Sequence, residues 1–150
     1  MISKKILDTI SGSISILYII PIVLYFITYD TFHLKALYGL IGTSAISEGI
    51  KRYIIKDISP RPSQAIDCNL LCNDGKQGGR PGMPSSHTAT VVFFTSMYFN
   101  KIHNIYVRII LITYTALMML SRYLKRCHTI NQIGGGLLLG FILSQLALTY

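Results

Sequence analysis

Two histidines stand close in the sequence to hydroxyl and guanidinium side chains, at spacings that suit chemistry on a phosphoryl group. His87 ends the run 84–87, which contains Ser85 and Ser86, and His128 follows Arg122 by six residues. A neutral imidazole can attack phosphorus, and a second imidazole can protonate the leaving oxygen. A guanidinium group can bind two phosphoryl oxygens at once and offset their negative charge. The pattern predicts phosphoryl transfer through a histidine nucleophile, with Arg61 as a further phosphate ligand.

The composition indicates that these residues lie within a membrane protein. Hydrophobic residues make up 51% of the 150 residues, charged residues only 13%, and the formal net charge is +8. Such a balance favours a bilayer over a soluble core. The basic residues stand at the ends of apolar runs, so anionic lipid headgroups explain the charge better than nucleic acid does. We therefore expect one membrane-embedded domain over residues 1–150, with the lipid bilayer as a partner and no nucleic acid.

The apolar runs predict an all-α integral membrane helical bundle with about five transmembrane helices. A helix needs about 20 apolar residues to cross the hydrocarbon core. Residues 9–29 carry no charge, and the last run is uncharged from His128 onward. We read the first run as a retained anchor and not as a signal peptide. The five predicted spans are residues 9–29, 34–55, 87–101, 105–120 and 129–150.

An extended loop is predicted between helices two and three, because residues 56–84 are rich in Gly, Pro, Asn and Asp. Five spans would bring this loop, His87 and His128 to one membrane face, while His33 and His103 would lie at the other. Two plainer interpretations stay open at this point. Basic residues at span ends can be topological anchors only, and a lone histidine at a helix start is often a capping or surface residue.

The motifs that contain these residues resemble those of the type 2 phosphatidic acid phosphatase superfamily, over roughly residues 51–140. The family's patterns are Lys-x6-Arg-Pro, Pro-Ser-Gly-His and Ser-Arg-x5-His-x3-Asp, and this chain contains Arg61-Pro62, Pro84-Ser85-Ser86-His87 and Ser121-Arg122-x5-His128. The resemblance implies a metal-independent, cofactor-free phosphatase. In it, His128 would be the nucleophile that becomes phosphohistidine, and His87 would be the general acid. The phosphate ligands implied are Lys51, Arg52, Arg61, Ser85, Ser86 and Arg122.

Two positions depart from the family pattern. The residue seven before Arg61 is Ile54, so the first motif requires two extra residues and either Lys51 or Arg52 as its cation. The family's aspartate, which orients the nucleophilic imidazole, is replaced by Gln132. An amide oxygen can accept a hydrogen bond but carries no charge, so orientation would survive with less electrostatic help.

With these departures, the chain resembles the dolichyldiphosphatase branch, in which the second motif reads Gly-Met-Pro-Ser-Ser-His and glutamine also replaces the aspartate. The resemblance implies hydrolysis of a polyprenyl diphosphate of the dolichyl or undecaprenyl type. Two alternatives stay open. One is a phosphatidate or phosphatidylglycerophosphate phosphatase, and the other is a catalytically impaired pseudoenzyme that binds lipid.

The cysteines and the charge bias bear on which side of the membrane the site faces. Cys68 and Cys72 allow a loop disulfide on an oxidising face, and Cys127 is expected to pack beside His128. Eleven of the fourteen Lys and Arg residues fall in segments of the predicted active face. By the positive-inside rule this bias places the site in the cytoplasm, whereas the family resemblance implies the lumen.

Overall fold

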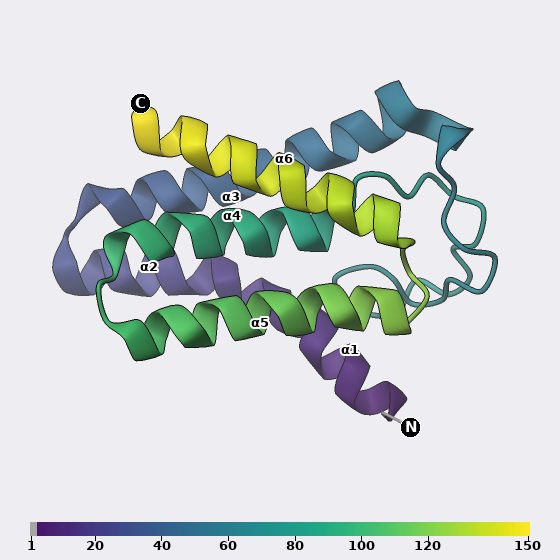
Figure 1. Ribbon diagram of the computed structural model, residues 1–150, viewed down its shortest axis with the longest axis horizontal. Coiled ribbons are helices and arrows are strands. Elements are labelled where there is room, and N and C mark those ends of the chain that lie inside the picture. Colours follow the sequence, from purple (N-terminus) through teal and green to yellow (C-terminus); the bar gives the residue numbers. More distant parts are fainter. Residues whose placement is uncertain (1–2) are drawn as a thin grey trace.

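The computed structural model describes residues 3–150, and all its regular elements are helices. Figure 1 shows the long helices running side by side, with the extended loop at one end of the bundle. The elements are α1 (Lys4–Gly12), η1 (Ser13–Ser15), α2 (Ile16–Thr28), α3 (Thr31–Gly49), η2 (Ile50–Ile55), η3 (Lys56–Ile58), α4 (Ser86–Lys101), α5 (Ile105–Leu124) and α6 (Ile130–Thr149). The predicted all-α fold is therefore confirmed.

Short polar side chains begin several of these helices by accepting hydrogen bonds from backbone N–H groups that lack a helical partner. The Asp30 carboxylate accepts from the Phe32 amide at the start of α3, and the Asn104 side chain accepts from the Tyr106 amide at the start of α5. Thr129 and Gln132 form a reciprocal capping box at the start of α6. These caps fix the position along the chain at which each helix begins.

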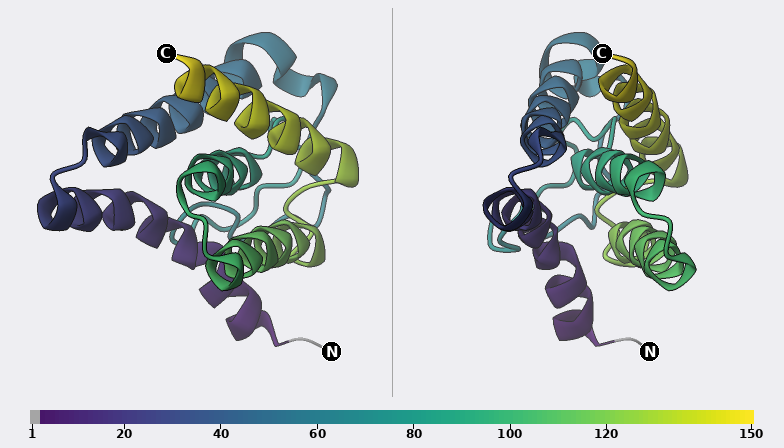
Figure 2. Two further views of the ribbon diagram at one scale, coloured as in Figure 1. Left: turned by 60° about the vertical axis from the view of Figure 1, so that its left-hand side comes forward. Right: turned by 90° about the vertical axis from the view of Figure 1, so that its left-hand side faces the viewer.

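The α4 helix lies at the centre of the bundle and contacts α3, α5 and α6 (Figure 2). Its buried residues include Ala89, Val91, Phe93 and Met97, which form the core together with side chains of α2 and α3. The α6 helix approaches α4 closely, as shown by the fact that a side chain at Gly140 would clash with the Ala89 carbonyl oxygen. Glycine on α6 thus allows α6 to pack directly against the α4 backbone. This contact brings the second motif, at the start of α4, close to the third motif, which ends at the start of α6.

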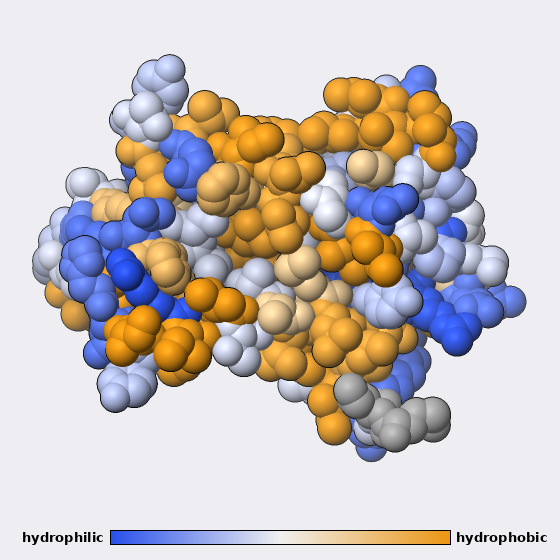
Figure 3. Space-filling view, in the orientation of Figure 1, coloured by the Kyte–Doolittle hydropathy of each residue, from blue (hydrophilic) through white to orange (hydrophobic). Residues whose placement is uncertain are grey.

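Three helical stretches of the described residues are long and apolar enough to cross a membrane: Lys4–Thr28, Ile105–Leu124 and Ile130–Thr149. The first begins earlier than the sequence predicts and changes direction where η1 separates α1 from α2 (Figure 1). Figure 3 shows apolar residues across the middle of the helices and hydrophilic residues toward both ends. This surface is that of a membrane protein.

The α3 and α4 helices are less apolar than those three stretches. The α4 helix has 16 residues, and its neighbours shield it from lipid, so it can carry the buried polar residues Thr88 and Thr90. The α3 helix carries Lys35 near one end and Glu48 near the other. Five crossings therefore stay a prediction.

The cysteines pair differently from the loop disulfide that the sequence allowed. Cys68 is bonded to Cys127, and Cys72 is free. Our expectation that Cys127 only packs beside His128 is therefore wrong. The bond joins two segments 59 residues apart, which sequence spacing could not indicate. It attaches the loop to the residue that precedes His128.

Candidate active site

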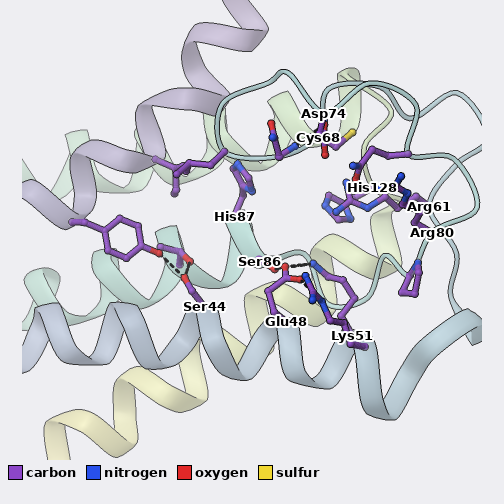
Figure 4. A pocket seen from close by; sticks show the side chains of 18 residues that line it. Ser44, Glu48, Lys51, Arg61, Cys68, Asp74, Arg80, Ser86, His87 and His128 are labelled. Carbon is purple, nitrogen blue, oxygen red and sulfur yellow. Dashed lines mark hydrogen bonds and ion pairs between the residues drawn. The ribbon is translucent and has the colours of Figure 1, made fainter.

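A cavity of about 620 Å³ lies where η2, the loop and the start of α4 meet. Figure 4 shows side chains from these segments around it, with His87 and His128 among them. Six of the nine residues predicted for the site line this cavity, namely Lys51, Arg52, Arg61, Ser86, His87 and His128. The fold thus brings together residues from all three sequence motifs.

His128 is almost fully buried, and its ring orientation is set by Gln132. The Nδ1 atom of His128 lies 3.2 Å from Oε1 of Gln132. The Nε2 atom of Gln132 donates to the carbonyl oxygens of Ser59 and Pro60, at 3.1 and 2.8 Å. Because these partners can only accept, the Gln132 amide must direct its oxygen toward His128. His128 therefore donates from Nδ1 and keeps a lone pair on Nε2.

Glycine at position 82 makes room for this arrangement, since a side chain there would lie 2.7 Å from the Gln132 amide. Burial is the main cause that lowers the pKa of His128 well below its usual value, and the nearby Arg122, Arg61 and Lys51 cations lower it further. The hydrogen bond with Gln132 opposes this shift. The imidazole is therefore neutral at physiological pH, which is the state that can attack phosphorus.

Four buried nitrogen atoms in or next to the cavity have no hydrogen-bond partner among residues 3–150. They are Nε and Nη1 of Arg61, Nε2 of His87 and Nε of Arg122. A buried donor without a partner is costly, so these atoms suit a ligand rich in acceptor oxygens. Burial lowers the pKa of Arg61, whereas the carboxylates of Glu48 and Asp74 raise it. A phosphate group would satisfy donors of this kind.

Lys51 and Arg52 occupy different positions at the cavity. The Lys51 side chain is 5% exposed, and its Nζ donates to the Ser86 hydroxyl at 2.9 Å. The Arg52 side chain is 71% exposed and lies at the rim. Both cations that could replace the first-motif lysine thus line the cavity, with Lys51 buried in its wall and Arg52 exposed at its rim.

Ser85 and Arg122 do not line the cavity, although both are fully buried next to it. The Ser85 hydroxyl accepts from Thr88, and its backbone N–H donates to the Gln132 carbonyl. The Arg122 guanidinium donates to the Ser11 hydroxyl and, at 2.5 Å, to the Cys68 carbonyl. Both residues therefore support the loop and the helix starts around the cavity.

Several residues of the cavity were not predicted as site residues from the sequence. Arg80 lies in the loop before the second motif, and Glu48 lies one helical turn before Arg52. Ile14 and Tyr18 come from the first helical stretch, where the sequence shows only a membrane anchor. Their apolar character carries no sign of a site, because the same residues would face lipid in any transmembrane helix.

No group of three or more His, Cys, Asp or Glu side chains within residues 3–150 is arranged to hold a metal ion. The donors around the cavity are mainly cationic and hydroxyl groups, which suit an anion. This donor set fits a phosphate-bearing substrate directly.

The comparison with known proteins leads to the same class. The sequence model of the PAP2 superfamily matches residues 32–150, so the chain belongs to this superfamily. PAP2 is a helical membrane fold, and membership supports a phosphatase that acts on lipid phosphates. No curated protein and no solved structure matches the chain.

Proposed function

We propose that the protein hydrolyses a lipid phosphate through a phosphohistidine on His128, most specifically a polyprenyl diphosphate. The observation that carries this proposal is the hydrogen bond between His128 and Gln132. It leaves the lone pair of the neutral imidazole on Nε2, in a cavity that is also lined by cationic side chains. Substrate phosphate would bind to Lys51, Arg61 and Ser86, with Arg52 at the rim.

The first step forms a bond between Nε2 of His128 and phosphorus, and breaks the bond between phosphorus and the leaving oxygen. The electron pair of the broken bond stays on that oxygen, which takes a proton from His87. His87 enters this step as the imidazolium, whose charge the bound phosphate anion stabilises against the neighbouring cations. Arg61 and Lys51 stabilise the charge on the remaining phosphoryl oxygens. The Gln132 oxygen holds the Nδ1 proton as His128 becomes cationic.

The second step releases the phosphate. Water attacks phosphorus and gives a proton to His87, which is neutral after the first step. The P–N bond then breaks, and its electron pair returns to Nε2 of His128. The enzyme regains its starting state without a redox change.

A polyprenyl diphosphate agrees best with the motif variants of this chain. The run Gly82-Met83-Pro84-Ser85-Ser86-His87 and the glutamine at position 132 resemble the dolichyldiphosphatase branch. Ile14 and Leu70 give the same cavity an apolar wall, which suits the first part of a lipid chain. Phosphatidate and phosphatidylglycerophosphate are the competing substrates.

The side of the membrane is proposed from the disulfide. Disulfides persist in oxidising compartments, so the bond between Cys68 and Cys127 favours a luminal or extracellular site. The charge bias toward the cytoplasm is weaker support, because it counts cations such as Lys51 and Arg61 that phosphate binding itself would require.

The pseudoenzyme is kept as a second candidate because Gln132 is uncharged and Arg122 is engaged by Ser11 and Cys68. Under this candidate, the cavity binds lipid phosphate without turnover. Detecting phosphate trapped on His128 by mass spectrometry, with samples kept alkaline because the P–N bond of phosphohistidine is acid-labile, would exclude it.

The deciding experiment measures phosphate release from polyprenyl diphosphate and phosphatidate, with chelator and no added metal. The wild type is expected to prefer the diphosphate, and His128→Ala to lose at least about 1,000-fold in rate, because the variant lacks the proposed nucleophile. The exposed His103, replaced in His103→Ala, is the matched control. Turnover of the His128→Ala variant near the wild-type rate, with an intact fold by circular dichroism, would disprove the mechanism.

A further inference from the structure

Glu48 is a carboxylate within the group of cations that lines the cavity. Its Oε1 accepts from Lys51 Nζ at 2.5 Å and from the Ser86 hydroxyl at 2.7 Å, and its Oε2 lies 3.7 Å from Nε of Arg52 (Figure 4). The side chain is 43% exposed, so it faces the cavity as well as its partners. The mechanism above gives this carboxylate no part.

The contacts of Glu48 form a closed arrangement with two donors that phosphate would also use. Lys51 Nζ donates to the Ser86 hydroxyl at 2.9 Å, and the Ser47 hydroxyl donates to Ser86 at 3.1 Å. Glu48 thus holds the ammonium and the hydroxyl in one place. A phosphate oxygen would make the same two contacts.

The second carboxylate of the cavity wall is engaged differently. Asp74 accepts from the backbone N–H groups of Cys68 and Asn69, at 2.8 and 3.3 Å. It therefore shapes the loop and contacts none of the cations of the cavity among the described residues. Glu48 is the carboxylate that directly contacts the donors proposed for phosphate.

We propose that Glu48 is a positioning residue that keeps Lys51 and Ser86 in place between turnovers and competes with phosphate for them; this inference rests on the proposed function. Lys51 is buried, so it needs a partner when no phosphate is bound. The same carboxylate repels the bound phosphate dianion. Glu48 therefore sets how readily inorganic phosphate, the product, leaves a cavity that also contains Arg52, Arg61 and Arg80.

Glu48→Gln separates these two effects. The amide oxygen of glutamine can still accept from Lys51 and Ser86, so the donors stay in place, but the negative charge is gone. We expect inorganic phosphate to bind about tenfold more tightly to the variant, because a charged competitor of the anion has been removed. Slower product release should lower kcat and KM together and leave kcat/KM less affected.

The experiment titrates inorganic phosphate into the purified full chain in lipid nanodiscs and measures both its dissociation constant and its inhibition of turnover. Glu48→Asp, which keeps the charge, should stay near the wild-type affinity. Asp57→Asn, which removes an exposed carboxylate outside the cavity, controls for net charge. Equal phosphate affinity in wild type and Glu48→Gln would overturn the inference, as would tightening in Glu48→Asp of the same size as in Glu48→Gln.

A measurement on the wild type keeps the inference testable if Glu48→Gln does not fold. Phosphate binding should free Glu48 from Lys51 and shift a carboxylate band in the infrared difference spectrum, and the absence of such a band would overturn the inference. Binding and turnover also separate the two proposals. If the wild type binds phosphate but does not hydrolyse lipid phosphates, and Glu48→Gln binds phosphate more tightly, the role of Glu48 is supported and the enzymatic function is rejected. If the wild type hydrolyses lipid phosphates and Glu48→Gln changes nothing, the enzymatic function is supported and the role of Glu48 is rejected.

Discussion

At the scale of single residues, the proposed chemistry depends on the hydrogen bond between His128 and Gln132. The sequence raised doubt about Gln132, since the family pattern has aspartate there. In the structure, the amide does what a carboxylate alone could not do. It accepts from His128 and also donates to the Ser59 and Pro60 carbonyl groups, which attaches the third motif to the residues just before Arg61.

Restoring a negative charge at this position should therefore be harmful. In Gln132→Glu, a carboxylate oxygen replaces the amide nitrogen and faces two carbonyl oxygens that have lost their donor. We expect a loss of about 1–3 kcal/mol in the free energy of unfolding, with lower activity. Unfolding in a detergent titration and phosphate release would measure both. Higher activity at unchanged stability would instead support the view that glutamine impairs an ancestral site.

The lowered pKa of His128 predicts how the rate and the stability depend on pH. Because the pKa of His128 lies below the ordinary histidine pKa of about 6.5, the nucleophile is still neutral at that pH. The acid limb of kcat/KM should therefore lie below pH 6.5. An unfolded chain binds this proton more readily than the folded one, so stability is complete above pH 6.5 and declines as the pH falls through the folded-state pKa. A pH–rate profile with an acid limb above 6.5 would contradict this prediction.

At the scale of elements, the pairing of α4 with α6 positions the two histidines. His87 lies in the first turn of α4, and His128 lies just before α6. Gly136 and Gly140 let these helices touch, since side chains there would meet the Ser85 and Ala89 carbonyl oxygens. The glycines of α6 are therefore in contact with the helix that carries the second motif.

Gly140→Ala is expected to separate α4 from α6 and to cost about 1–3 kcal/mol of stability, because the added methyl group meets a backbone oxygen that cannot move aside. Gly134→Ala on the same helix is the control, since a side chain at that position meets nothing within 4 Å. It should be neutral or slightly stabilising. Thermal unfolding of both variants tests the contrast, and equal effects would show that the close approach is unimportant.

At the scale of the whole molecule, the first helix and the loop are held to the rest by contacts that span the sequence. Asp8 lies 2.6 Å from Lys125, Lys4 lies 3.1 Å from Asp67, and Ser11 accepts from Arg122. The segment preceding the family match thus takes part in the site. It contributes one wall of the cavity and supports the loop that carries Arg61.

The disulfide adds a covalent link to these contacts. Before reduction, a thiol reagent of high mass should label Cys72 alone, and after denaturation and reduction it should label all three cysteines. Reduction should also destabilise the protein by about 2–4 kcal/mol and lower its activity, since the loop is then less constrained. A gel-shift assay on membranes shows the labelling. Three reactive thiols in freshly isolated, unreduced protein would disprove both the bond and the oxidising side.

The sequence by itself determined the helical class and the limits of most helices, and it predicts the two histidines as site residues, because these depend on local properties such as apolar length, caps and motif spacing. The sequence predicts one helix over residues 34–55, for example, and the structure has α3 and η2 over residues 31–55. The tertiary structure alone decided the partner of Cys127, the burial of Lys51 and the exposure of Arg52 at the cavity, and the places of Ser85 and Arg122 outside the cavity. Each of these depends on which side chains meet across long sequence separations, and such meetings leave no periodic signal in the chain.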